Sequence, residues 1–147
     1  QGDVLSSAAL IMAQAPTARA AVEAVLRATA DRLTRPDLPR GCMTVTSAMN
    51  CGEEFSHLAE ELARRRKASL QRLCDRLDQA LAEGELPAGT NTSALATFYQ
   101  TMAQGMTIQA RDGASRDELL ATVEAAMRAW PGENEVHHDP EPADAVG

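Results

Sequence analysis

The chain has 147 residues and a formal net charge of −7 at pH 7, and its length suits one domain with a core of ordinary size. Residues 131–147 hold five acidic residues and no Lys or Arg, so the remainder is nearly neutral and excludes the broad basic face that nucleic-acid phosphates require. Only 3% of the residues are aromatic, and no stretch alternates long enough for a strand, so we expect an all-α fold.

Two helices are expected before residue 36. The first runs from Asp3 to Gln14 and is apolar on nearly every side, so we expect it to be buried. The second begins at Thr17, a good N-cap residue, and continues to about Thr34. Pro36 and Pro39 end it.

The middle of the chain predicts a short helix and a long one. The segment from Gly41 to Gly52 has no charged residue and should be enclosed by other helices. The next helix runs from Glu53 to Glu83, and at 1.5 Å per residue it should be roughly 45 Å long. Gly84 is its expected C-cap.

Two more helices complete the predicted set of about six. Asn91 should cap a helix that ends near Arg111, within a run from Leu86 to Ala110 that carries no charge. Such a helix is too polar to span a membrane and too poor in charge to be solvated, so we expect protein on more than one side. Ser115 and Glu118 form a predicted capping box for the last helix, which should end at Pro131.

Three segments carry a resemblance to a known family: Arg40 to Cys42 in a stretch reading RPDLPRGCMTVTSAM, Glu83 to Pro87 (EGELP), and Gln109 to Ser115 (QARDGAS). Over residues 3–131 the sequence resembles the regulatory domain of TetR-family transcriptional regulators. We therefore expect residues 1–131 to be a helical ligand-binding and dimerisation domain, followed by an acidic flexible tail over residues 132–147.

The resemblance implies a function. Regulators of this family bind operator DNA through an N-terminal helix-turn-helix, which this sequence does not contain. The chain should be the sensing half of a cytoplasmic repressor that a small apolar or amphipathic effector releases from DNA. The resemblance implies a homodimer whose last two helices form a four-helix bundle with their copies, with no enzymatic activity, no cofactor and no contact with a membrane.

Candidate residues follow for both roles. Apolar and adaptable side chains on the charge-poor helices should line the effector pocket: Met12, Met43, Thr46, Met49, Phe55, Cys74, Phe98, Tyr99 and Met102. Small and apolar residues of the last two helices should form the dimer interface: Ala103, Met106, Ala110, Leu120, Val123, Met127 and Trp130. A charge at Met102 should then damage the pocket, and a charge at Met127 should damage the dimer.

Two alternative functions remain open at this point. Glu54 and His57 have the Glu-x-x-His spacing found in di-iron bundles, although such a site needs a second pair and two further carboxylates. A thiol-based redox sensor could use Cys42 or Cys51, of which Cys42 is the better placed, near a helix N-terminus and Arg40. In both places a plain structural role is the simpler interpretation.

Overall fold

The computed structural model of the chain describes residues 4–38 and 56–132. This part contains five helices and no strand: α1 (Val4–Gln14), α2 (Ala18–Leu33), α4 (Ser56–Ala82), α5 (Thr92–Arg111) and α6 (Arg116–Met127). The all-α prediction is confirmed. The predicted helix from Gly41 to Gly52 and the predicted tail from residue 133 onward lie outside the described residues.

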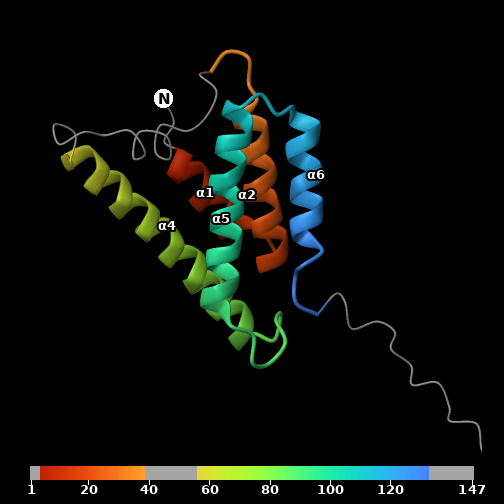
Figure 1. The fold of residues 1–147 in the computed structure, drawn as a ribbon. Coiled ribbons are helices and arrows are strands. Elements are labelled where there is room, and N and C mark those ends of the chain that lie inside the picture. The colour runs from red at the N-terminus through yellow and green to blue at the C-terminus, as the bar shows by residue number, and fades with distance from the viewer. Residues whose placement is uncertain (1–3, 39–55, 133–147) are drawn as a thin grey trace, which may run out of the picture.

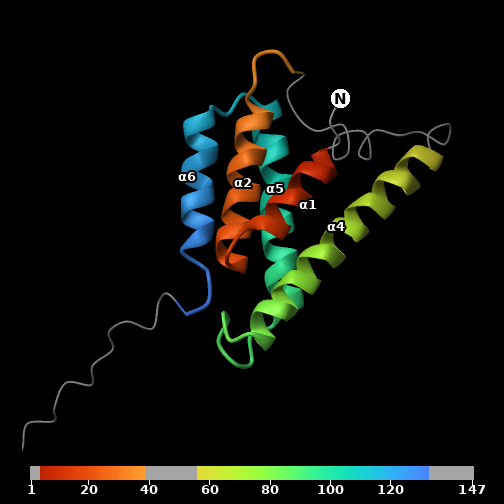
Figure 2. The same cartoon turned by 180° about the vertical axis from the view of Figure 1, so that it is seen from behind.

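Three helices pack on one another as a small bundle, and α4 slants across this bundle. α2, α5 and α6 lie roughly along one direction, while α1 crosses beside α2 on the side that faces α4 (Figures 1 and 2). α4 has 27 residues, about 40 Å at 1.5 Å per residue, and its N-terminal half extends beyond the other described helices. Its C-terminal half packs against α5 and α2, so α1, α2, α4 and α5 surround one region of the molecule.

The helix starts predicted at Thr17, Asn91 and Ser115 are confirmed. The side-chain oxygens of Thr17 and Asn91 accept hydrogen bonds from the backbone amides three residues later, which satisfies donors that a helix leaves unpaired. Ser115 and Glu118 form the predicted capping box. The backbone amide of Ser115 donates to the Glu118 carboxylate, 2.7 Å away, and this bond holds the pKa of Glu118 below its ordinary value.

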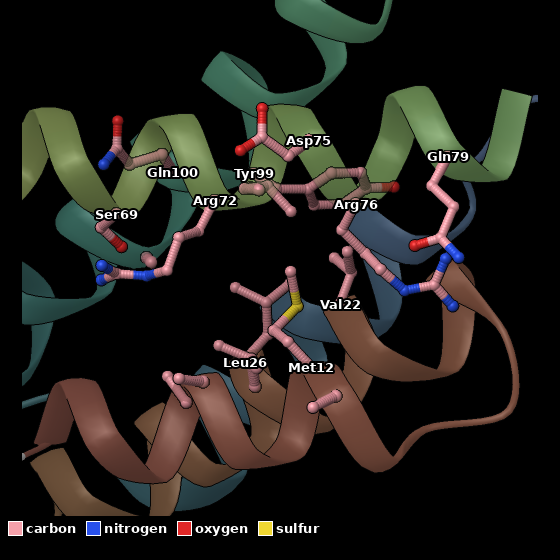
Figure 3. A pocket seen from close by; sticks show the side chains of 16 residues that line it. Met12, Val22, Leu26, Ser69, Arg72, Asp75, Arg76, Gln79, Tyr99 and Gln100 are labelled. Atoms are coloured by element: carbon pink, nitrogen blue, oxygen red, sulfur yellow. The ribbon is translucent and has the colours of Figure 1, made fainter.

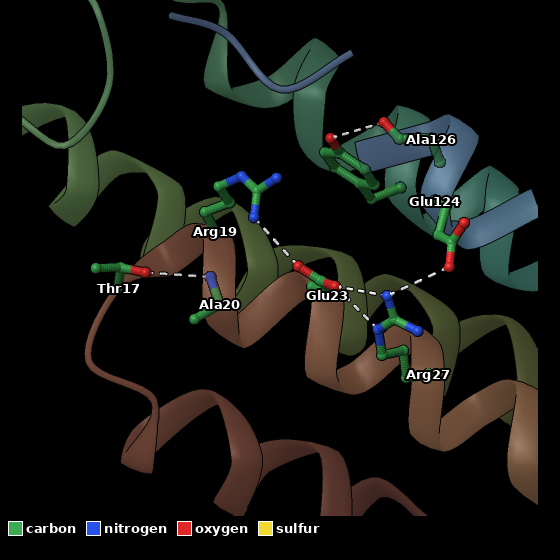
Figure 4. Close-up of polar contacts among 8 residues, drawn as sticks. Thr17, Arg19, Ala20, Glu23, Arg27, Glu124 and Ala126 are labelled. Atoms are coloured by element: carbon green, nitrogen blue, oxygen red, sulfur yellow. Dashed lines mark hydrogen bonds and ion pairs between the residues drawn. The ribbon is translucent and has the colours of Figure 1, made fainter. Parts of the chain in front are cut away.

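The core joins α2, α4, α5 and α6. Its largest fully buried side chains come from three of these helices: Leu77, Tyr99, Met106, Leu119 and Val123. The Tyr99 hydroxyl is buried as well and donates to the carbonyl of Ala126, 3.3 Å away, so it links α5 to α6 (Figure 4). A buried hydroxyl needs such a partner, and this one fixes how Tyr99 lies.

A chain of ion pairs follows the outer side of α2. Glu23 pairs with Arg19 at 3.2 Å and with Arg27 at 2.9 Å, and Arg27 also approaches Glu124 of α6 at 3.9 Å (Figure 4). Arg116, at the start of α6, pairs with Asp31 of α2 at 2.6 Å. Partly exposed pairs of this kind contribute little energy each, and of these pairs only those of Arg27 with Glu124 and of Arg116 with Asp31 join α2 to α6.

The burial predicted for the first helix is wrong. Leu10 is 59% exposed, and Ser7, Ala9, Ala13 and Gln14 are exposed too. The reason is that α1 packs along one side on α2, while no helix of the described residues covers its opposite side. Low charge therefore indicated a helix with few polar groups, but not how many of its faces are covered.

Candidate functional site

A cavity of about 360 Å³ lies between α1, α2, α4 and α5 (Figure 3). This volume is near the lower end of the roughly 300–1,000 Å³ typical of small-molecule sites. Its apolar wall is made of Ala8, Ala9, Met12, Ala13, Val22, Val25, Leu26, Leu73, Tyr99 and Ala103. Three alanines on α1 and one on α5 leave space that larger side chains would occupy, because protein interiors are otherwise closely packed.

The polar side of the cavity comes mainly from α4. Ser69, Arg72, Arg76 and Gln79 are spaced three or four residues apart, so they lie near one face of that helix, and Asp75 lies beside Arg76. Gln100 of α5 also lines the cavity. In Figure 3, Arg72 and Arg76 extend along the α4 wall, whereas the Asp75 carboxylate points away from Met12 and Leu26.

Most of these polar groups already have hydrogen-bond partners. The Gln100 amide donates to the carbonyl of Arg66 at 2.8 Å, and the Gln79 amide donates to Glu83 at 2.8 Å. Asp75 accepts from the amide of Gln71 at 2.8 Å. Tyr99 lines the cavity, but its hydroxyl donates to the carbonyl of Ala126. These bonds position the wall and leave the bonded groups less free to bind a ligand.

Arg76 differs from its neighbours. Its side chain is 15% exposed, and its Nη2 lies 3.7 Å from Oε1 of Glu85, which is longer than a hydrogen bond. The other oxygen of Glu85 accepts from the backbone amide of Ala18 at 2.6 Å, at the start of α2. The Nη1 atom of Arg76 is buried and has no hydrogen-bond partner in the part of the chain that the structure describes.

Comparison with known proteins identifies the family. A profile described as "Tetracyclin repressor-like, C-terminal domain" matches residues 18–126. The chain belongs to this TetR family. Among curated proteins it is similar to the HTH-type transcriptional repressor ComR of Escherichia coli (strain K12), with 32% identity over 104 residues, covering 71% of the chain and 50% of ComR.

Solved TetR-family structures share the fold. A cysteine mutant of the TetR family transcriptional regulator CifR, described as complexed with 26 bp double-strand operator DNA, has 36% identity and a TM-score of 0.81. A putative TetR transcriptional regulator from Rhodococcus sp. RHA1 has 32% identity and a TM-score of 0.71. The matches cover 86% and 89% of this chain, and 66% and 68% of those proteins. The chain thus spans about half the length of ComR and two thirds of CifR.

Only some of the residues predicted for the effector pocket of the TetR-family domain line the cavity. Met12 and Tyr99 line the cavity. Cys74 and Met102 are partly buried against the core, and Phe98 is 40% exposed; none of the three is among the lining residues. Burial and the nearby carboxylates of Asp78 and Asp75 raise the pKa of the Cys74 thiol, which disfavours a reactive thiolate. Met43, Thr46, Met49 and Phe55 lie outside the described residues.

Sequence reasoning missed the polar wall on α4 and the contribution of α2. Arg72 and Arg76 are one turn apart in a helix rich in charges, a pattern that normally indicates a solvated face. The available clue was Leu73 beside them, since Ser69, Leu73 and Arg76 share a helical face. That mixture of one apolar and several polar residues is typical of a pocket wall. This face of α4 lines a cavity only because α1 lies opposite it.

Most of the residues predicted for the dimer interface lie in the core of the domain itself. Met106, Ala110, Val123, Met127 and Trp130 are each at most 4% exposed within the single chain, and Ala103 and Leu120 are half-buried against the core. A side chain that its own chain already covers adds little area for contact with a second copy. A charge at Met127 is therefore expected to damage the fold before it affects association.

A different face of α5 is open. Ala94, Phe98, Thr101, Gly105 and Ile108 recur at spacings of four and three residues, which we call the open stripe of α5. Phe98 and Ile108 are 40% and 38% exposed, and a Cβ atom built on Gly105 would meet nothing within 4 Å. The stripe has no charge, and its spacing is typical of a helix seam that packs on another helix.

The two alternative functions rest on residues that the structure describes only in part. His57 is exposed at the start of α4, whereas Glu54, Cys42 and Cys51 lie outside the described residues. Within the described ranges, no three His, Cys, Asp or Glu residues are grouped so as to hold a metal ion. No helix in those ranges is long and apolar enough to cross a membrane.

Proposed function

We propose that this chain is the sensing and dimerisation half of a transcriptional repressor, and that a small molecule in the cavity releases the repressor from its operator. The observation that carries the proposal is the cavity of about 360 Å³, enclosed by four helices of a TetR-family domain. ComR is described as a repressor, and CifR as a regulator complexed with operator DNA. In this protein, DNA contacts would come from a helix-turn-helix ahead of residue 1.

The first helix would connect the cavity to such a DNA-binding segment. Ala8, Ala9, Met12 and Ala13 of α1 line the cavity, and α1 is the described helix nearest to the N-terminus. A ligand that fills the space between α1 and α4 changes how α1 packs, and packed helices respond by moving as rigid bodies. In a twofold dimer, such a movement alters the separation of the two DNA-reading units and hence their fit to the operator.

The open stripe of α5 supports the proposed dimerisation. Its apolar and small side chains face outward from the single chain, and twofold association would bury the stripe against its copy. A glycine in the middle of a helix lowers the stability of the helix by about 1 kcal/mol relative to alanine. At Gly105 the missing side chain would allow a second helix to approach closely. Phe98 and Ile108 would supply the apolar contacts on either side.

A cavity-blocking substitution tests the sensing proposal. In a repressor with a helix-turn-helix joined ahead of residue 1, we expect at least one member of a panel of six- to ten-carbon alcohols, amines and carboxylates to weaken operator binding by about tenfold. Ala103→Trp should fill the cavity, keep operator binding and abolish this response. Fluorescence anisotropy of labelled operator DNA measures both quantities.

The matched control is Ala28→Trp, which places the same side chain on the exposed side of α2. This variant should keep the wild-type response. The proposal is contradicted if no compound in the panel weakens operator binding, or if a folded Ala103→Trp protein responds as the wild type does.

A further inference from the structure

We infer that the cavity selects a small amphipathic carboxylate, held at its anionic end by Arg76 and along its hydrocarbon part by Met12, Leu26 and Leu73. This inference rests on the proposed function, because it assigns a chemical class to the effector of the same cavity. It is carried by the buried Nη1 atom of Arg76, which has no partner among the described residues, on the polar side of a cavity whose α1 and α2 sides are apolar.

The unpartnered nitrogen indicates a missing hydrogen-bond acceptor. Buried polar atoms in native proteins nearly always have a partner, and guanidinium nitrogens are donors only. Gln79, Gln100 and Asp75 carry acceptor oxygens on the cavity wall, but none of them forms a hydrogen bond with Nη1. A ligand oxygen in the cavity would satisfy Nη1.

The charge balance favours an anion over a neutral acceptor. The guanidinium of Arg76 is a cation, and the carboxylate that pairs with it, that of Glu85, lies 3.7 Å away. Glu85 is also engaged with the amide of Ala18, where the positive end of the α2 dipole attracts negative charge. Arg72 and Asp75 add one positive and one negative charge to the same wall, and the Arg72 guanidinium extends away from that of Arg76 (Figure 3). The compensation of the Arg76 charge is therefore incomplete, and a ligand carboxylate would complete it.

The apolar lining and the volume of the cavity determine which hydrocarbon part of the ligand fits. The wall opposite α4 consists of alanines and Met12 from α1 and of Val22, Val25 and Leu26 from α2. These side chains offer no polar group, so they suit a hydrocarbon chain or ring. A cavity of about 360 Å³ suits a compound of modest size, which excludes long lipids as whole ligands.

Calorimetric titration of the 147-residue chain with octanoate, 1-octanol and octylamine tests the inference. The three probes share a hydrocarbon chain and differ in the charge of the head group. We expect octanoate to bind at least about tenfold more tightly than octanol, because charge-assisted hydrogen bonds are the strong ones. Octylamine should bind more weakly than either, because its positive charge would approach Arg76.

Substitution of the guanidinium gives the second arm. Arg76→Gln should lower octanoate affinity to the level of octanol and leave octanol affinity unchanged. Arg65→Gln, on an exposed part of the same helix where Arg65 pairs with Glu61 at 2.9 Å, should change neither. Far-UV circular dichroism checks that each variant is folded. If Arg76→Gln fails to fold, the wild-type ranking of the three probes decides the question.

The outcomes distinguish this inference from the proposed function. Equal affinities of octanol and octanoate, or full octanoate binding by folded Arg76→Gln protein, would overturn the carboxylate assignment and leave the cavity as an effector site. Binding of none of the three probes would overturn the carboxylate assignment too, and the panel assay on operator release would then decide whether the cavity senses another class of compound.

Discussion

Leu77→Ala is expected to lower the free energy of unfolding by about 2–5 kcal/mol. Leu77 is fully buried on α4 and belongs to the core cluster that joins α2, α4, α5 and α6. Truncation removes apolar contacts and leaves a space that the surrounding helices fill only in part. Since small domains are stable by only about 5–15 kcal/mol, the loss is a large fraction of the total.

Urea denaturation followed by the fluorescence of Trp130 measures this loss, at one fixed protein concentration because association contributes to stability. Leu10→Ala is the matched control, since Leu10 is 59% exposed on α1. Its expected effect is within about 0.5 kcal/mol. Equal losses in the two variants would show that α4 does not hold the core as described.

Ile108→Glu is expected to separate the dimer that we propose and to leave the single chain folded. Ile108 is 38% exposed on the open stripe of α5, so a carboxylate there stays in water when the chain is alone. In a twofold dimer each copy would bury one unpaired carboxylate at the interface, which is strongly unfavourable. We expect the dissociation constant to rise at least about a hundredfold.

Sedimentation equilibrium measures the change in association. Leu58→Glu is the control, because Leu58 is an apolar residue of similar exposure, 42%, on the protruding half of α4. It should leave the dimer intact. A wild-type chain that sediments as a monomer, or an Ile108→Glu chain that dimerises as the wild type does, would contradict the assignment of the open stripe.

The starts of α2, α5 and α6 and the end of α4 could be predicted because they depend on neighbours in the sequence, whereas α6 ends at Met127, short of the predicted Pro131. Thr17, Asn91 and Ser115 cap helices through bonds to amides three residues away, and Gly84 adopts the positive φ of +81° that ends α4. These interactions require no knowledge of the tertiary structure. The same is true of the family, whose resemblance was carried by short segments.

The faces of the helices could not be predicted in the same way. Met106 and Val123 are apolar whether their own chain or a second copy covers them, and only the packing of α5 and α6 on α2 shows that they are core. Arg76 has the sequence context of a solvated residue. It becomes part of a cavity wall because α1 and α2 pack opposite α4 with small side chains between them.

We expect a small molecule to bind between α1, α2, α4 and α5. Methyl-resolved NMR of the chain, titrated separately with octanol and with octanoate, tests it most directly. The methyl groups of Met12, Leu26 and Leu73, which line the cavity, should shift with at least one probe. Those of Leu119, buried in the core outside the cavity, should stay. Unchanged cavity methyls, or shifts centred on Leu119 or Ile108 instead, would contradict the claim.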